Sequence, residues 1–148
     1  MTEHEIENIN FFTKAEIENT GAKLEDVNVE LFLRMQILRA HLGRRILLLP
    51  NGLTTGKHSS RQHPNGLACD FTFHSQDGSV DVEDIYYSCM HNADFQRYGV
   101  YWNGEQFSFH VEINDAGRKS WCAIKDENNE WKYFALMADP RNTMGGHK

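Results

Sequence analysis

Apolar residues recur in the first third of the chain at the spacing of an amphipathic helix. The clearest stripe predicts a helix over roughly residues 27–42, with Gly43 at the position of a C-terminal cap. Thr13 and Glu16 have the spacing of a capping box, which predicts a short helix that begins there. A second apolar stripe between residues 82 and 90 predicts another helix.

Short apolar or alternating runs between these stripes are typical of strands. The Asn103-Gly104 pair is a strong hairpin signal, and residues 50–65 have the Gly, Ser, Thr and Pro content of a loop. The predicted strands cover residues 45–49, 67–73, 99–102, 107–113 and one segment within 121–136. Helices set against a mostly antiparallel sheet make an α+β domain, and 148 residues fit a single domain over 1–148.

Composition and charge exclude several function classes. The net charge is −6 and no basic stripe is present, so we do not expect a nucleic-acid partner. No apolar run reaches the length of a membrane span, and the polar first ten residues are unlike a signal peptide. We therefore expect synthesis in the cytoplasm without a signal peptide. The odd count of three cysteines, without tight spacing, predicts buried thiols rather than disulfides or a four-cysteine zinc site.

Two segments carry candidate metal chemistry. The first is His63-Pro-Asn-Gly-Leu-Ala-Cys-Asp70, and the second is Phe107-Ser-Phe-His110-Val-Glu112. Two imidazoles and a carboxylate suit Zn²⁺ and leave one tetrahedral position open for water, which is the pattern of a catalytic site. Ligands on adjacent strands would make that site rigid.

The pattern His63-x-x-Gly-x-Ala-x-Asp70 resembles the first signature of the zinc D-alanyl-D-alanine carboxypeptidase and L-alanyl-D-glutamate endopeptidase family. The stretch from Gly99 to Glu112 is similar to the strand that carries the third ligand in that family, and Arg118 with Trp121 resembles a pattern near the end of its small members. The resemblance spans roughly residues 10–122.

The resemblance implies a hedgehog-like fold and a zinc ion held by His63, Asp70 and His110. It also implies hydrolysis of peptide bonds in peptidoglycan stem peptides, as in small phage-type members. Such a protein would act on the cell wall after release or as part of a virion, where virion proteins would be its partners.

The residue at the position of the family's catalytic acid differs in this chain. The position three residues before the last histidine is Phe107, which cannot transfer a proton. Glu112 lies two residues after His110, so strand alternation places both on one face. Glu105, at the predicted hairpin, is the alternative. We favour Glu112 as the acid near the metal, while it can equally serve as a partner that orients a ligand.

The substrate-binding residues depart as well. The family often carries an arginine after the strand that precedes its first motif, and here that region reads Leu-Pro-Asn-Gly-Leu-Thr over 49–54. Arg61 or Lys57 can replace it, Arg61 because a guanidinium matches a carboxylate with two hydrogen bonds, although a charge in a loop is more often simply solvated. Tyr101 and Trp102 are candidates to line the cleft, although aromatic residues in strands are more often core.

Three functions are therefore open. The first is a zinc peptidase that acts on cell-wall peptides. The second is a metal-binding domain without catalysis, such as a structural or recognition component of a virion. The third is an α+β structural domain in which the motif is a coincidence.

Overall fold

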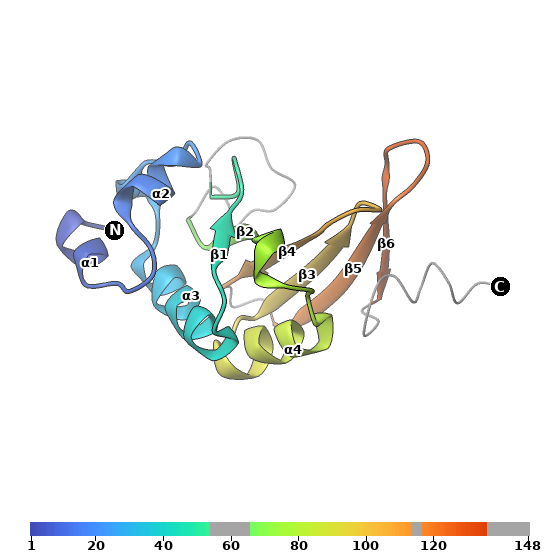
Figure 1. The fold of residues 1–148 in the computed structure, drawn as a ribbon. Coiled ribbons are helices and arrows are strands. Elements are labelled where there is room, and N and C mark those ends of the chain that lie inside the picture. Colours follow the sequence, from blue (N-terminus) through green and yellow to red (C-terminus); the bar gives the residue numbers. More distant parts are fainter. Residues whose placement is uncertain (54–65, 114–116, 136–148) are drawn as a thin grey trace.

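The computed structural model describes residues 1–53, 66–113 and 117–135, and its chain forms helices packed on one six-stranded sheet (Figure 1). The α+β class predicted from the sequence is confirmed at this coarse level. Within the described residues, no helix combines the length and apolar character that crossing a membrane requires. His63 and Arg61 lie outside the described residues.

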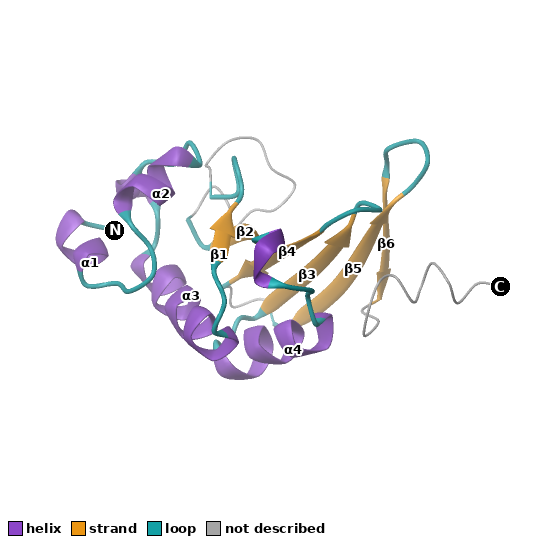
Figure 2. Cartoon of the chain, in the orientation of Figure 1, coloured by secondary structure: helices purple, strands orange, loops and turns teal. Residues whose placement is uncertain are grey.

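Helices occupy the N-terminal third and the segment between the second and third strands (Figure 2). Thr13 caps α2 by accepting a hydrogen bond from the backbone of Glu16, and Gly43 ends α3 with a φ of 64°. Both features were predicted. The helical elements are α1 (Glu3–Glu7), α2 (Lys14–Asn19), η1 (Leu24–Asp26), α3 (Val29–Leu42), η2 (Ser75–Asp77), α4 (Val82–Tyr87) and η3 (Ser88–Asn92).

The helix α1 was not among the predicted elements. Thr2 caps it and pairs with Glu5 in a reciprocal capping box, so the same sequence signal that marks α2 is present here. With only one core residue, Ile6, the segment shows no apolar periodicity from which a helix could be predicted.

Six strands form one sheet in the order β1-β2-β4-β3-β5-β6. Four of the five strand pairs are antiparallel, and β3 and β5 are parallel. The prediction of a mostly antiparallel sheet is confirmed. The strands are β1 (Ile46–Leu48), β2 (Ala68–Phe73), β3 (Arg97–Trp102), β4 (Phe107–Glu112), β5 (Lys119–Lys125) and β6 (Trp131–Ala135).

The C-terminal segment contains two strands, whereas the sequence predicted one. A tight turn separates β5 from β6, because the Asp126 carboxylate accepts hydrogen bonds from the backbone of Asn128 and Glu130, both at 2.9 Å. Asn129 takes a φ of 65°, which asparagine tolerates. The polar run Asp-Glu-Asn-Asn-Glu over 126–130 is itself a turn signal in the sequence, and it divides the segment into two strands.

One face of the sheet packs against the helices. Alternate residues of the central strands pack against the helices in one core, which includes Phe71, Tyr98, Phe109 and Val111 together with residues of α3. The Tyr86 ring of α4 meets Tyr98 at a centroid distance of 5.4 Å, which fixes α4 on this face. We call this the core face, and the opposite side the open face.

All three cysteines are free thiols and buried, as predicted. Burial raises the pKa of the Cys69 thiol well above its ordinary value, and burial also raises the pKa of Cys89. They therefore behave as small apolar residues of the core.

Candidate metal centre

Asp70 and His110 meet on the open face of the sheet. The antiparallel register of β2 and β4 places them directly opposite each other, and their side chains approach to 2.8 Å between Asp70 Oδ1 and His110 Nδ1. Cross-strand neighbours on one face are the closest side-chain pairs that a sheet offers. Two of the three predicted ligands are thus brought together on adjacent, rigid strands.

Glu112 contacts the other nitrogen of the same imidazole. Its Oε1 lies 2.8 Å from His110 Nε2, and its side chain is buried. Strand alternation puts both residues on one face, as the sequence predicted. The resulting arrangement is a histidine held between two carboxylates.

Arg97 extends this chain of charges from the neighbouring strand. The register of β3 and β4 pairs Arg97 with Glu112, and the guanidinium Nε lies 4.0 Å from Glu112 Oε1. Arg97 was missed from the sequence. Arg97 begins β3 and pairs with Glu112. This pairing cannot be predicted without knowledge of the register between β3 and β4.

The two carboxylates control the charge of His110. Burial alone lowers the pKa of the imidazole, but the hydrogen bonds and negative charges of Asp70 and Glu112 outweigh it and raise the pKa to about 9. With this pKa the ring is a cation at neutral pH, and each ring nitrogen donates a hydrogen bond to one carboxylate.

The backbone of Asp70 is fixed by the segment after β1. Gly52 accepts a hydrogen bond from Asp70 N at 3.0 Å, and Asp70 O accepts one from Leu49 N at 3.1 Å. A Cβ atom at Gly52 would lie 2.7 Å from Asp70 O, so only glycine permits this approach.

Gly66, in the first motif, also makes a close approach. It has a φ of 70°, its carbonyl accepts a hydrogen bond from Asn28 N at 3.1 Å, and a Cβ atom there would lie 2.2 Å from the carbonyl oxygen of Asp26. Gly66 therefore lets the backbone that leads into β2 contact the start of α3.

The remaining predicted residues are distributed differently. Tyr101 lies on the open face, whereas Trp102 lies on the core face, where its ring meets Phe107 at 4.6 Å. The structure therefore does not bring Trp102 to His110. Glu105 is exposed in the β3–β4 turn, beyond the Trp102–Phe107 pair, which itself lies three residues or roughly 10 Å along β4 from His110.

Phe107 also belongs to the core face, since it alternates with His110 along β4. A proton-transferring side chain at this position would point away from Asp70 in this register. The position is occupied by an aromatic residue because the core requires one there.

Asp70 and His110 are residue types that commonly bind zinc. Within the described ranges, no group of three or more His, Cys, Asp or Glu side chains is arranged to hold a metal. Asp70 and His110 supply one oxygen and one nitrogen that face each other, and Glu112 can accept a hydrogen bond from the Nε2–H group of a neutral ring whose Nδ1 has lost its proton. Zinc-bound histidines commonly have such a carboxylate on the far nitrogen.

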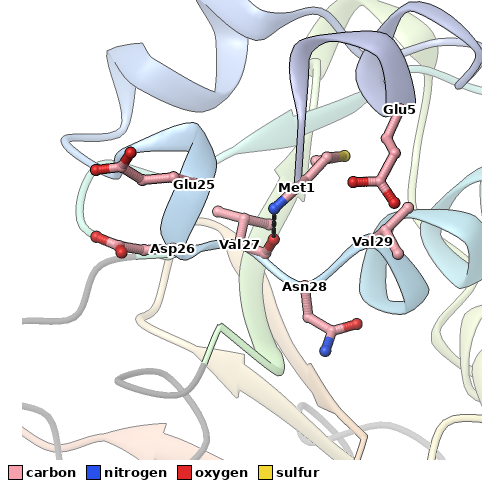
Figure 3. A pocket seen from close by; sticks show the side chains of 7 residues that line it. All are labelled: Met1, Glu5, Glu25, Asp26, Val27, Asn28 and Val29. Atoms are coloured by element: carbon pink, nitrogen blue, oxygen red, sulfur yellow. Dashed lines mark hydrogen bonds between the residues drawn. The ribbon is translucent and has the colours of Figure 1, made fainter.

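A pocket of about 330 Å³ lies elsewhere, beside the N-terminal helices (Figure 3). The ammonium group of Met1 donates hydrogen bonds to the carbonyls of Leu24 at 3.2 Å and Val27 at 2.6 Å, so this charge is already bound. The lining residues are Met1, Glu5, Glu25, Asp26, Val27, Asn28 and Val29. None of them belongs to either candidate motif.

Comparison with known proteins assigns no family. No protein-family model matches the chain, and neither the curated proteins nor the solved structures that were searched give a match. The functional argument therefore depends on the geometry around His110.

Proposed function

We propose that the chain is a zinc-dependent hydrolase of peptide bonds in the stem peptides of bacterial peptidoglycan. One observation carries the proposal. His110 presents Nδ1 to the carboxylate of Asp70 at 2.8 Å, while Glu112 holds Nε2 at 2.8 Å from the other side. The resemblance of the two motifs supplies the reaction class and the hedgehog-like fold, which are part of the same proposal.

Asp70, His110 and His63 would hold the metal. Zinc in an open site of this kind polarises a carbonyl and lowers the pKa of a bound water to about 7. Glu112 keeps the His110 ring in the orientation and tautomer that coordination through Nδ1 requires. Arg97, close to Glu112, stabilises that carboxylate in its charged form.

The proton acceptor for the reaction stays a prediction, with Glu112 and Glu105 as the two candidates. Glu112 is in contact with His110, and Glu105 is exposed on the turn between β3 and β4. Because Glu112 already binds His110, it acts at least as a positioning residue.

The test is a digest of purified peptidoglycan, followed by mass analysis of the released muropeptides. Zinc-loaded protein should cut the stem peptides, and a chelator should stop the reaction. Asp70→Asn and His110→Ala should both abolish turnover. Ser108→Ala is the matched control, because Ser108 lies on the same face of the same strand and should leave turnover unchanged.

A second candidate is a metal-binding module without turnover, such as a virion component. The contact of Glu112 with His110 favours it, since a carboxylate engaged in positioning is less free to accept a proton from water. Bound zinc that raises the melting temperature while every muropeptide stays intact would support this candidate and refute the first.

A further inference from the structure

Aromatic side chains continue from His110 across the open face to the edge strand β6. The Trp121 ring lies 5.5 Å from the His110 ring, and Trp121 Nε1 donates a hydrogen bond to the Tyr101 hydroxyl at 2.9 Å. The Tyr101 ring then meets those of Trp131 at 5.2 Å and Tyr133 at 6.2 Å. We call Tyr101, Trp121, Trp131 and Tyr133 the aromatic strip.

Small residues beneath the strip hold its rings in place. One register row reads Gly99, Trp121, Ala135, and the next reads Tyr101, Ala123, Tyr133. A Cβ atom at Gly99 would lie 2.5 Å from the Trp121 indole, so the indole crosses β3 over this glycine. Alternation of large and small residues packs the Trp121 indole over Gly99 before any ligand arrives, which reduces the entropy that ordering this ring on binding would cost.

The strip is exposed on a face where polar residues are expected. Tyr133 is 60% exposed, and the other three rings are half-buried. Within the described residues, the helices pack on the core face of the sheet rather than on the open face of β3, β5 and β6 (Figure 1). Exposed apolar surface that is contiguous often marks a binding site.

The chemistry of the strip indicates a sugar ligand. Flat ring faces stack on the C–H faces of pyranose rings, while the hydroxyls of Tyr101 and Tyr133 can bond to sugar hydroxyls and amides. Lys125 lies over the Trp131 ring at 5.1 Å and Arg97 over the Trp121 ring at 5.8 Å. In a chain of net charge −6, these cations at both ends favour a ligand that carries carboxylates.

We propose that the aromatic strip binds the glycan strand of the wall polymer while the attached stem peptide reaches the His110 site. Contact between Trp121 and His110 makes the two surfaces continuous. From the row of Trp121 to that of Trp131, β5 advances four residues, roughly 13 Å, which accommodates a short run of sugar rings. The choice of polymer depends on the proposed function, whereas stacking of a sugar on the strip does not.

The experiment titrates metal-free protein with the β-1,4-linked hexamer of N-acetylglucosamine, monitored by calorimetry and by tryptophan fluorescence. The hexamer should bind in the absence of zinc. Tyr133→Ala should weaken binding roughly two- to tenfold, the range expected for loss of one stacked ring. Tyr87→Ala is the matched control, because Tyr87 is also an exposed tyrosine, at 56%, but lies on α4. It should bind the hexamer as the unaltered chain does.

The outcomes separate this inference from the proposed function. Absence of hexamer binding, or equal binding by the unaltered chain, Tyr133→Ala and Trp131→Ala, would overturn the inference, even if isolated stem peptides are cut. Binding that depends on the strip would uphold it, even if no peptide is cut. If sedimentation shows a dimer that Tyr133→Ala dissociates, the strip is an interface between copies of the chain, and the inference is refuted.

Discussion

The two faces of β4 differ in what their side chains do, although they belong to one run of six residues. On the core face, Phe109 is buried among the rings of Phe71 and Phe73 at 5.5 Å each. On the open face, His110 is equally buried but is enclosed by two carboxylates and an indole. Alternation along a single strand therefore separates stability from chemistry, and substitutions on the two faces should have different consequences.

The largest expected effect lies on the core face. Phe109→Ala removes a fully buried ring and should lower the free energy of unfolding by about 3–5 kcal/mol. Urea denaturation followed by circular dichroism measures it. Ser108→Ala, the adjacent residue on the open face, should change stability by no more than about 0.5 kcal/mol. Equal losses for the two variants would contradict the division between the faces.

A smaller effect, confined to metal binding, is expected at Glu112. Glu112→Gln retains an oxygen that can accept the Nε2 proton but removes the charge, and it should weaken zinc binding about 10- to 100-fold. Competition with a chromogenic chelator measures the affinity. Glu105→Gln, on the exposed turn, should leave affinity unchanged. If Glu105→Gln instead abolishes turnover at full zinc occupancy, Glu105 is the proton acceptor.

A substitution at Gly99 tests the position of the Trp121 indole, the ring that joins the aromatic strip to His110. Gly99→Ala places a methyl group against the Trp121 indole, and because that ring is half-buried and can shift, the cost should be about 1 kcal/mol of stability. The shift should also break the hydrogen bond to Tyr101 and change tryptophan fluorescence. Unchanged stability and fluorescence would mean that the indole does not lie over Gly99.

The last prediction concerns the proton that His110 must lose when zinc binds. His110, with a pKa of about 9 in the metal-free chain, is protonated at pH 7 and must lose a proton before Nδ1 can bind zinc. Zinc affinity should therefore rise by up to about tenfold per pH unit from this residue, and the rise should level off near pH 9. Calorimetry in buffers of different ionisation enthalpy counts the proton. Levelling off near pH 6.5 would show that the carboxylates do not raise this pKa.

Local signals in the sequence predicted most of the fold. The cap at Thr13, the glycine after α3 and the hairpin at Asn103 each depend on neighbours along the chain, and the structure has all three. The division into β5 and β6 was missed although the polar run over 126–130 is a local turn signal, which the Asp126 carboxylate completes by accepting hydrogen bonds from the backbone.

The candidate site was predicted only in part, because its geometry depends on register. Asp70 and His110 were recognised by residue type and spacing, and the placement of Glu112 followed from alternation. Arg97 and Gly99 enter the site only because β3 pairs with β4 at one register among several possible ones. Trp102 was paired with Tyr101 in the prediction, yet adjacent strand residues face opposite sides, so the two could not both line one cleft.

The most direct test of the metal centre is nitrogen NMR of the His110 ring, recorded before and after addition of one equivalent of zinc, with His110→Ala to assign the signals. We predict that both ring nitrogens are protonated without metal. With zinc, Nδ1 should take the chemical shift of a metal-bound nitrogen while Nε2 keeps its proton toward Glu112. A ring whose two nitrogen signals do not change on zinc addition would contradict the account.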